Sequence, residues 1–117
     1  MNKEQITAEL IQFTGTEHYY RHPFGFNYTD GVRFVAKECK AYWLIDEIAS
    51  WRLVEKIKRE EFLVYKLKVN EDRTADLSIE DGNDNIIARQ KIEFTDFPLE
   101  EITMWFTNGV LYLPSEH

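Results

Sequence analysis

The feature that most constrains the fold is a regular alternation of apolar and polar residues in the second half of the chain. Every second side chain is apolar in 63–69 and 75–79, and again in 86–94, where Gln90 is the one exception. A period of two places successive side chains on opposite faces of a β-strand. The turn-forming residues 81–85 separate the second run from the third. The pattern therefore predicts an antiparallel meander of three half-buried strands.

Matching the apolar faces of these strands predicts their register. Leu67 is expected opposite Leu77, and Leu77 opposite Ala88. On the other face this register places Lys68 beside Asp76 and Asp76 beside Arg89. Opposite charges in neighbouring strands stabilise a sheet by a few tenths of a kcal/mol per pair, and a one-residue slip would expose the apolar face.

Helical spacing predicts the elements before the meander. Asn2 is a candidate N-cap for a helix that carries apolar residues three and four apart and ends at Gly15. A second helical stretch begins at Thr29 and ends near Trp51. Its apolar stripe changes phase in the middle, which predicts two short helices or one kinked helix. A strand over 32–35 is the alternative.

The residues after the meander are predicted to form a last helix and a last strand. Thr95 and Asp96 are candidate caps, Pro98 fits a first helical turn, and Leu99, Ile102 and Phe106 share one helical face, which Asn108-Gly109 would end. Residues 110–113 follow as a short strand. The predicted fold class is α+β, an antiparallel meander of three to four strands with helices packed on one face.

Composition and charge limit the organisation and the partners. With 117 residues the chain suits one core, so a single domain over 1–117 is expected. Residues 1–60 hold nine basic and nine acidic side chains, whereas 61–117 hold five and twelve, so the net charge of −7 lies in the second half. This excess argues against nucleic acid or an anionic membrane as partner. It favours a protein partner that docks on the acidic C-terminal half.

Apolar runs and cysteine content add two further limits. No run approaches the roughly 20 apolar residues of a spanning helix. Cys39 is the only cysteine, so disulfides are excluded, and it lies on an apolar helical stripe where a buried, inert thiol is expected. The protein is therefore expected to be cytoplasmic.

The segment 17–28 is the main candidate for a site, because it combines aromatic, basic and imidazole side chains. Such a segment either fills the core at a sheet edge or forms a ligand or partner surface. The candidate residues for that surface are His18, Tyr20, Arg21, His22 and Asp30.

Three other patterns have structural explanations. His18 and His22 have the spacing of two zinc ligands on a helix, but Pro23 follows, and in an extended chain they would lie about 13 Å apart. Residues 81–85 contain the oxygen ligands of a calcium loop without its later Gly and Glu, so a turn is expected. Asp30 and Asp96 could form an acid–base pair, but capping of helices needs fewer assumptions. No metal site, cofactor or catalytic residue is therefore assigned.

Several stretches together resemble an uncharacterised bacterial family of small single-domain proteins, a domain of unknown function. They are FTGTEHYYRH (13–22), YTDGV (28–32), AYWL (41–44), EDGN (80–83), TDFPL (95–99) and LPSE (113–116). The resemblance covers nearly the whole chain. It implies a complete bacterial protein, and it transfers no activity, ligand or functional residue.

Two functional hypotheses follow. The first is a non-enzymatic, protein-binding accessory domain that uses the acidic half; a mimic of nucleic acid is a narrower form of it. The second is a small-molecule binder or small enzyme with its site at 18–28. The second requires those side chains to line a cavity. Oligomeric state stays open, with a homo-oligomer through an edge strand at residues 110–113 as one option.

Overall fold

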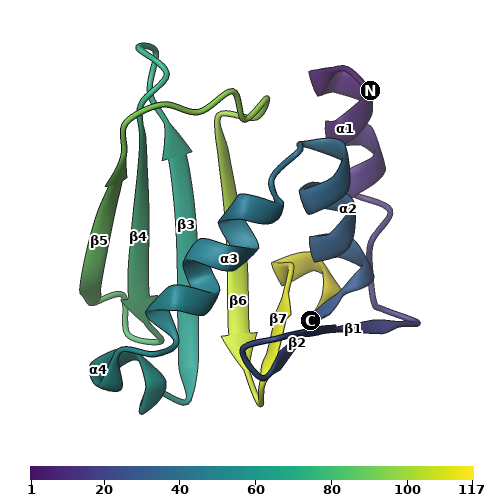
Figure 1. The fold of residues 1–117 in the computed structure, drawn as a ribbon. Helices are drawn as coiled ribbons and strands as arrows, with labels where there is room; N and C mark the ends of the chain where they lie inside the picture. The colour runs from purple at the N-terminus through teal and green to yellow at the C-terminus, as the bar shows by residue number, and fades with distance from the viewer.

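The computed structural model describes residues 1–117, which form four α-helices, seven strands and a final 3₁₀ turn (Figure 1). The helices are α1 (Lys3–Leu10), α2 (Asp30–Glu38), α3 (Tyr42–Trp51) and α4 (Glu55–Lys58), and the 3₁₀ turn is η1 (Pro114–Glu116). The strands are β1 (Tyr19–His22), β2 (Phe26–Thr29), β3 (Phe62–Val69), β4 (Ala75–Asp81), β5 (Ile86–Ile92), β6 (Glu101–Thr107) and β7 (Val110–Tyr112). The fold is therefore α+β. No helix is both long and apolar enough to cross a membrane.

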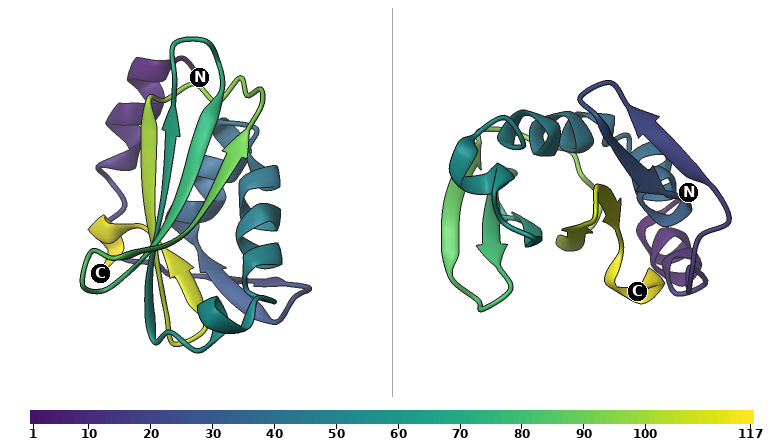
Figure 2. Two further views of the ribbon diagram at one scale, coloured as in Figure 1. Left: turned by 90° about the vertical axis from the view of Figure 1, so that its left-hand side faces the viewer. Right: turned by 90° about the horizontal axis from the view of Figure 1, so that it is seen from below.

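All seven strands belong to one sheet, in the order β1-β2-β7-β6-β3-β4-β5. β2 and β7 run parallel, and all other neighbours are antiparallel. The expectation of three to four strands was wrong, because the β1–β2 hairpin and β6 also join the sheet. The hairpin leaves the plane of the central strands and bends toward the side of the sheet that carries α3 (Figure 2).

The meander β3–β4–β5 forms as expected, with one change of register. Leu67 lies opposite Leu77 and Lys68 opposite Asp76, which confirms the first pairing. The second pairing was wrong by two residues, because Leu77 lies opposite Gln90 and Asp76 opposite Lys91. A β-bulge after Ile79 shifts the register near the β4–β5 turn. The row of alternating charges is still formed, because Lys91 lies beside Asp76 where Arg89 was expected.

Residues 101–107 form strand β6, so the predicted last helix was wrong. Ile102 and Phe106 fit one face of a helix, but with Met104 they also fit one face of a strand. β-Branched and aromatic residues favour the strand, and β6 pairs with β3 on one side and β7 on the other. The preceding residues form a loop, in which the Arg73 guanidinium donates to the carbonyl oxygens of Thr95 and Phe97 at 3.0 and 2.8 Å.

The N-terminal helices begin where the sequence indicated. Asn2 caps α1 through a capping box with Gln5, and the Thr29 hydroxyl accepts from the amide of Val32 at the start of α2. The phase change marks two separate helices, α2 and α3, so the alternative strand over 32–35 was wrong. Lys40, between the two helices, has a φ of 52°. The left-handed backbone there allows the chain to change direction.

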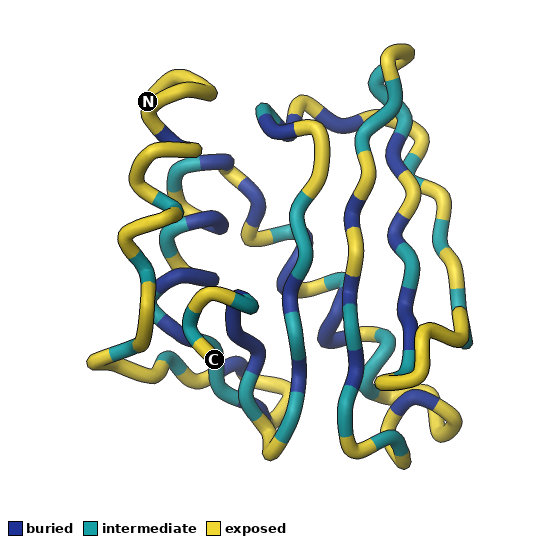
Figure 3. The backbone as a smooth tube through the Cα atoms, turned by 180° about the vertical axis from the view of Figure 1, so that it is seen from behind, coloured by how far each residue is buried: buried dark blue, intermediate teal, exposed yellow.

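The core lies between α3 and one face of the central strands. In Figure 1, α3 crosses in front of β3 and β6, and seen from behind these strands carry buried residues between more accessible ones (Figure 3). Leu44 and Ile48 of α3 pack on Leu67 and Leu77 without space for a water molecule. Gln90 faces this side because its amide bonds both Trp51 and Glu47 of α3, at 2.7 and 2.8 Å.

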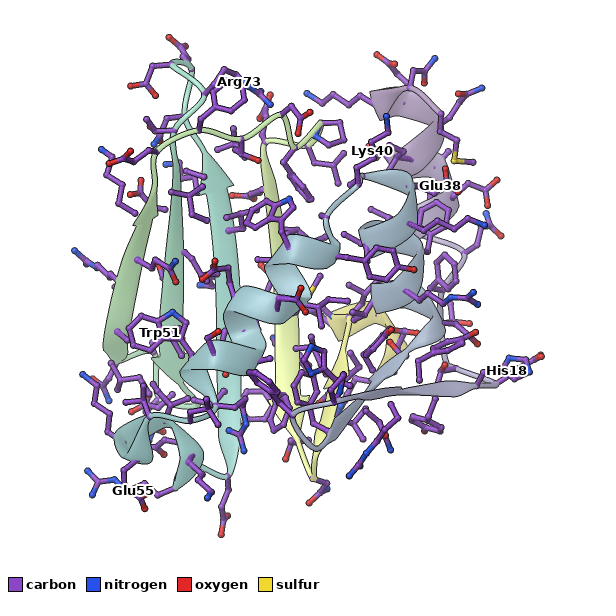
Figure 4. The ribbon with its side chains drawn as sticks, viewed as in Figure 1. His18, Glu38, Lys40, Trp51, Glu55 and Arg73 are labelled. Carbon is purple, nitrogen blue, oxygen red and sulfur yellow. The ribbon has the colours of Figure 1, made fainter.

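The opposite face of the sheet has no helix over β3–β5 and carries an aromatic cluster near β7. The Trp105 ring lies 5.5 Å from Phe62 and 6.1 Å from Tyr112, measured between centroids. Trp51, in contrast, lies on the α3 side (Figure 4). The expectation that residues 110–113 form an edge strand was wrong, because β7 lies inside the sheet between β2 and β6. A homo-oligomer stays a prediction.

The C-terminal turn closes the fold on α2. The Glu116 carboxylate accepts from the Thr29 hydroxyl at 2.7 Å and from the Gly31 amide at 3.0 Å. A carboxylate at this end of a helix satisfies a free N–H group and the helix dipole. A Cβ at Gly31 would come within 2.7 Å of the Glu116 and Leu113 side chains, so the close contact depends on glycine.

Candidate functional site

The predicted site segment folds into the β1–β2 hairpin, which the parallel β2–β7 pairing holds against the sheet. Its three-residue loop starts at Pro23 and ends at Gly25, whose φ of 97° suits glycine. Tyr20 and His22 share one face of β1, because they are two residues apart, and Arg21 lies on the other face. The segment therefore forms two short strands and the tight loop between them.

His22 joins the hairpin to α3. Its Nε2 lies 3.0 Å from Oδ1 of Asp46, and its Nδ1 lies 3.0 Å from the backbone nitrogen of Phe24. A backbone N–H can only donate, so Nδ1 is the acceptor. Nε2 then carries the hydrogen and donates to Asp46. Both ring nitrogens are thus engaged within the protein, and neither is free to act on a substrate.

Aromatic contacts fix the orientation of the imidazole. The His22 ring stacks on Phe26, with centroids 4.8 Å apart and planes 8° from parallel. Phe24 meets the imidazole edge-on at 5.4 Å. Phe26 in turn packs edge-on against Phe106 of β6, at 5.6 Å. His22, which is 8% exposed, is therefore held by the core and by hydrogen bonds together.

A cleft of about 490 Å³ opens between the hairpin loop and α3, beside the His22–Asp46 pair. Its lining includes three aromatic rings, a carboxylate, an imidazole and a hydroxyl, from Phe24, Tyr28, Tyr42, Asp46, His22 and Ser50. Two of these rings are unusually accessible for large apolar groups, since Phe24 is 53% exposed and Tyr42 46%. Burial raises the pKa of Tyr28 above its ordinary value of 10, so it is an uncharged phenol at neutral pH.

The α3 side of the cleft is a stripe that sequence analysis missed. Tyr42, Asp46 and Ser50 are four residues apart, which puts them on one face of the helix. Ser50 donates to the backbone oxygen of Asp46 at 3.1 Å. The signal was present, because these polar side chains recur at a helical period in a mostly apolar helix. Nothing in the sequence, however, connected this stripe to a hairpin some twenty residues earlier.

Asp30, a predicted site residue, belongs to a different cluster at the start of α2. One oxygen accepts from the amides of Glu17 and His18, at 3.0 and 3.2 Å, and the other from the Tyr20 hydroxyl at 2.9 Å. Burial acts to raise the pKa of Asp30, but these hydrogen bonds outweigh it and lower the pKa from 3.8 to about 2. Asp30 is therefore a fixed anion that fastens the preceding loop.

The Asp30 cluster continues to Arg33. The Arg33 guanidinium donates to the Tyr20 hydroxyl at 3.0 Å and lies over the Tyr20 ring, 4.5 Å from its centroid. Tyr20, Asp30 and Arg33 border a hollow of about 290 Å³ that is separate from the cleft. Within it, the Tyr20 hydroxyl bonds both Asp30 and Arg33.

The structure therefore divides the predicted site residues into three sets. Tyr20 and Asp30 lie together, with the imidazole of His18 3.6 Å from the Asp30 carboxylate. His18 is otherwise exposed and extends away from the body of the protein (Figure 4). His22 lies with Asp46 at the cleft, and Arg21 is exposed on the far face of the hairpin.

The remaining patterns have structural roles. Asp81 accepts from the amides of Asn83 and Asn85, so residues 81–85 form the expected turn. No three His, Cys, Asp or Glu side chains converge as a metal site would require. Burial, with the Glu38 charge as a smaller cause, raises the pKa of the Cys39 thiol to about 11, which leaves it protonated.

By fold and site, this is a small α+β protein with an aromatic-lined cleft between a hairpin and a helix. The model of a family described as a family of unknown function (DUF6876) matches residues 4–117, and the chain belongs to that family. No curated protein and no solved structure shows significant similarity to the chain. The resemblance to a family of unknown function is thereby confirmed, and function has to be argued from the site itself.

Proposed function

We propose that the protein is a non-enzymatic binding domain and that the cleft between the β1–β2 loop and α3 is its ligand site. The observation that carries this proposal is the exposure of Phe24 and Tyr42 on opposite sides of a preformed cleft. Ligand sites are concave, largely apolar, and contain a few convergent polar groups within some 300–1,000 Å³. The cleft of about 490 Å³ fits this description.

The chemistry of the cleft supports binding rather than catalysis. A general base needs a free acceptor, and His22 has none, since Nδ1 is bonded to Phe24 and Nε2 to Asp46. Of the two carboxylates considered, Asp30 lies outside the cleft and is a permanent anion, and Asp46 is bonded to His22 through Oδ1 and keeps only Oδ2 free. The Ser50 hydroxyl donates to the backbone oxygen of Asp46 rather than to a carboxylate or an imidazole.

The protein-partner hypothesis has weaker support from the acidic half, because several of its carboxylates are engaged internally. Glu80 is 7% exposed and pairs with Lys66 at 3.2 Å. The Asn85 amide, with backbone amides, holds the pKa of Asp81 below its ordinary value, and Thr74 does the same for Asp72. A protein partner for this half stays a prediction.

The proposal extends to the setting of the molecule. We place the binding domain in a bacterial cytoplasm and treat residues 1–117 as one domain. One continuous cluster of 24 buried residues spans helices and sheet, which supports a single domain. A lone, buried, unpaired Cys39 is compatible with a reducing compartment.

A fragment screen monitored by amide NMR tests the proposal. Fragments that bind the cleft should shift the resonances of residues 22–28 and 42–50 together. The substitution Tyr42→Ala should then weaken binding about fivefold or more, because it removes one wall. Tyr19→Ala is the matched control, since Tyr19 is 59% exposed on β1 and does not line the cleft. The proposal fails if no fragment shifts these resonances, or if both variants weaken binding equally.

A further inference from the structure

The cleft has the chemistry of a site for a small organic cation, and we infer that its ligand is a free substituted ammonium compound. This inference rests on the proposed function, that the cleft is a ligand site. Three observations lead to it: the charge of the lining, the arrangement of aromatic rings, and the fixed position of Asp46.

The lining of the cleft is negatively charged. Asp46 is its one acidic residue, and it has no lysine or arginine. Arg33, on the neighbouring helix, is held by Tyr20 through its hydroxyl and over its ring, and its guanidinium also reaches the Tyr42 hydroxyl from outside the lining. The Asp46 carboxylate would repel an anionic ligand, and a neutral ligand would not compensate its negative charge. A cation is complementary to it.

The Asp46 carboxylate is available on one side only. Oδ1 receives the hydrogen of His22 Nε2 at 3.0 Å, whereas the side chain as a whole is 73% exposed. Oδ2 has no hydrogen-bond partner within the protein and is therefore the atom that a ligand would meet. The His22 contact fixes the direction of the carboxylate, and the Ser50 hydroxyl bonds the Asp46 backbone. A site fixed before binding loses less entropy when the ligand arrives.

The aromatic rings provide the second half of a cation site. Phe24 lies on the hairpin loop, Tyr28 on β2 and Tyr42 on α3, so the rings come from three elements around one cleft. The face of an aromatic ring attracts a cation, by about 0.5–2 kcal/mol per ring, depending on exposure. Alkyl groups on the nitrogen favour this environment, since they contact rings and need no hydrogen bonds.

Other ligands fit the lining less well. A metal ion would need further anionic or imidazole ligands, and Asp46 is the one carboxylate present, while His22 has no free nitrogen. A volume of about 490 Å³ suits a whole small molecule rather than the tip of a side chain on a partner protein. We therefore assign the site to a free ammonium compound.

Choline and its uncharged carbon analogue, 3,3-dimethylbutan-1-ol, separate charge from shape. Both are titrated into the protein while amide resonances of residues 22–28 and 42–50 are followed. Choline should bind at least tenfold more tightly than the alcohol. A peptide that contains trimethyllysine, titrated in the same way, tests the other source of the same chemical group and should bind more weakly than choline.

Asp46→Asn is the decisive variant. Asparagine retains an oxygen that can accept from His22 and removes the charge, so choline affinity should fall about tenfold while affinity for the alcohol stays unchanged. Asp84→Asn is the matched control, because Asp84 is exposed in the β4–β5 turn with a φ of 65°, a conformation that asparagine tolerates. Choline affinity should be the same in this control as in the wild type.

The possible outcomes separate the two proposals. If the alcohol binds as tightly as choline, or Asp46→Asn leaves choline affinity unchanged, the ammonium inference is overturned and the ligand site stands. If the peptide binds more tightly than choline, the free small molecule is overturned in favour of a protein side chain. If neither the fragments nor any of these probes shifts the cleft resonances, the proposed function itself is wrong.

Discussion

Two aspartates near the β1–β2 hairpin show opposite ways of holding a carboxylate. Asp30 receives hydrogen bonds on both oxygens and is 23% exposed in its side chain. Asp46 receives one, from His22, and is 73% exposed. Both oxygens of Asp30 are therefore bonded within the protein, whereas one oxygen of Asp46 is left free beside the cleft.

The difference separates a carboxylate that is bonded on both oxygens from the one that the proposed site uses. Asp30 holds the loop before β1 against the start of α2, and the protein gains stability from its charge. Asp46 bonds one side chain, that of His22, and most of its own side chain is exposed. A carboxylate kept half-satisfied beside exposed rings is best explained by a ligand, which is why the cleft and not the Asp30 cluster is the proposed site.

The largest expected effect is on the stability of Asp30→Asn. An asparagine side chain has one acceptor oxygen where Asp30 has two, so at least one charge-assisted hydrogen bond is lost. Its NH₂ group would also face N–H or O–H donors. The free energy of unfolding should fall by about 2 kcal/mol. Urea unfolding followed by circular dichroism measures this change. An unchanged unfolding midpoint would mean that Asp30 does not fasten the loop.

The free energy of unfolding should also depend on pH because of the hydrogen bonds to Asp30. The pKa of Asp30 is lowered to about 2 in the folded protein, against an ordinary value of 3.8. The stabilisation that ionised Asp30 gives to the folded protein is therefore essentially complete above about pH 4, and it is lost as the pH falls from about 4 toward 2. The stability difference between wild type and Asp30→Asn should shrink across this range. A difference that stays constant between pH 5 and pH 2 would contradict the lowered pKa.

The smallest effect is expected for the stability of Asp46→Asn. The variant retains an oxygen for His22 and alters an exposed side chain, so the free energy of unfolding should change by less than about 0.5 kcal/mol. The same urea experiment measures it. A loss as large as that of Asp30→Asn would make Asp46 a structural residue and remove the contrast on which the proposed site depends.

Local patterns predicted the parts of the fold that depend on local physics. The Asn2 cap, the Thr29 cap and the alternation of β3 and β4 all appear as expected. The error over 101–107 came from a pattern that fits a helix and a strand equally well. Long-range pairing with β3 and β7 decided between them, and no local pattern contains that information. The register of β5 differs from the expected one, and the β-bulge after Ile79 contributes to the difference. The alternation of apolar and polar residues does not reveal such a bulge.

The candidate site was predicted only in part, because its residues come from segments that are separate in the sequence. His22 and the aromatic residues around it were identified, but Tyr42 and Asp46 were not, since they reach the cleft from a separate helix. Asp30 and Tyr20 were grouped with His22 because they are close in sequence. The structure places them in another cluster, since the hairpin contacts α2 and α3 at different points along its length.

The position of β7 has a consequence for how the protein is made. β7 is the strand that joins the β1–β2 hairpin to the rest of the sheet, and it is synthesised long after the hairpin itself. Until residues 110–116 are available, the hairpin lacks its sheet neighbour and α2 lacks the Glu116 carboxylate at its start. The cleft is therefore among the last parts of the molecule to become ordered, because contacts between distant segments form late and slowly. A ribosome-bound chain that stops before β7 would have its helices and meander without the strand that holds the hairpin side of the cleft.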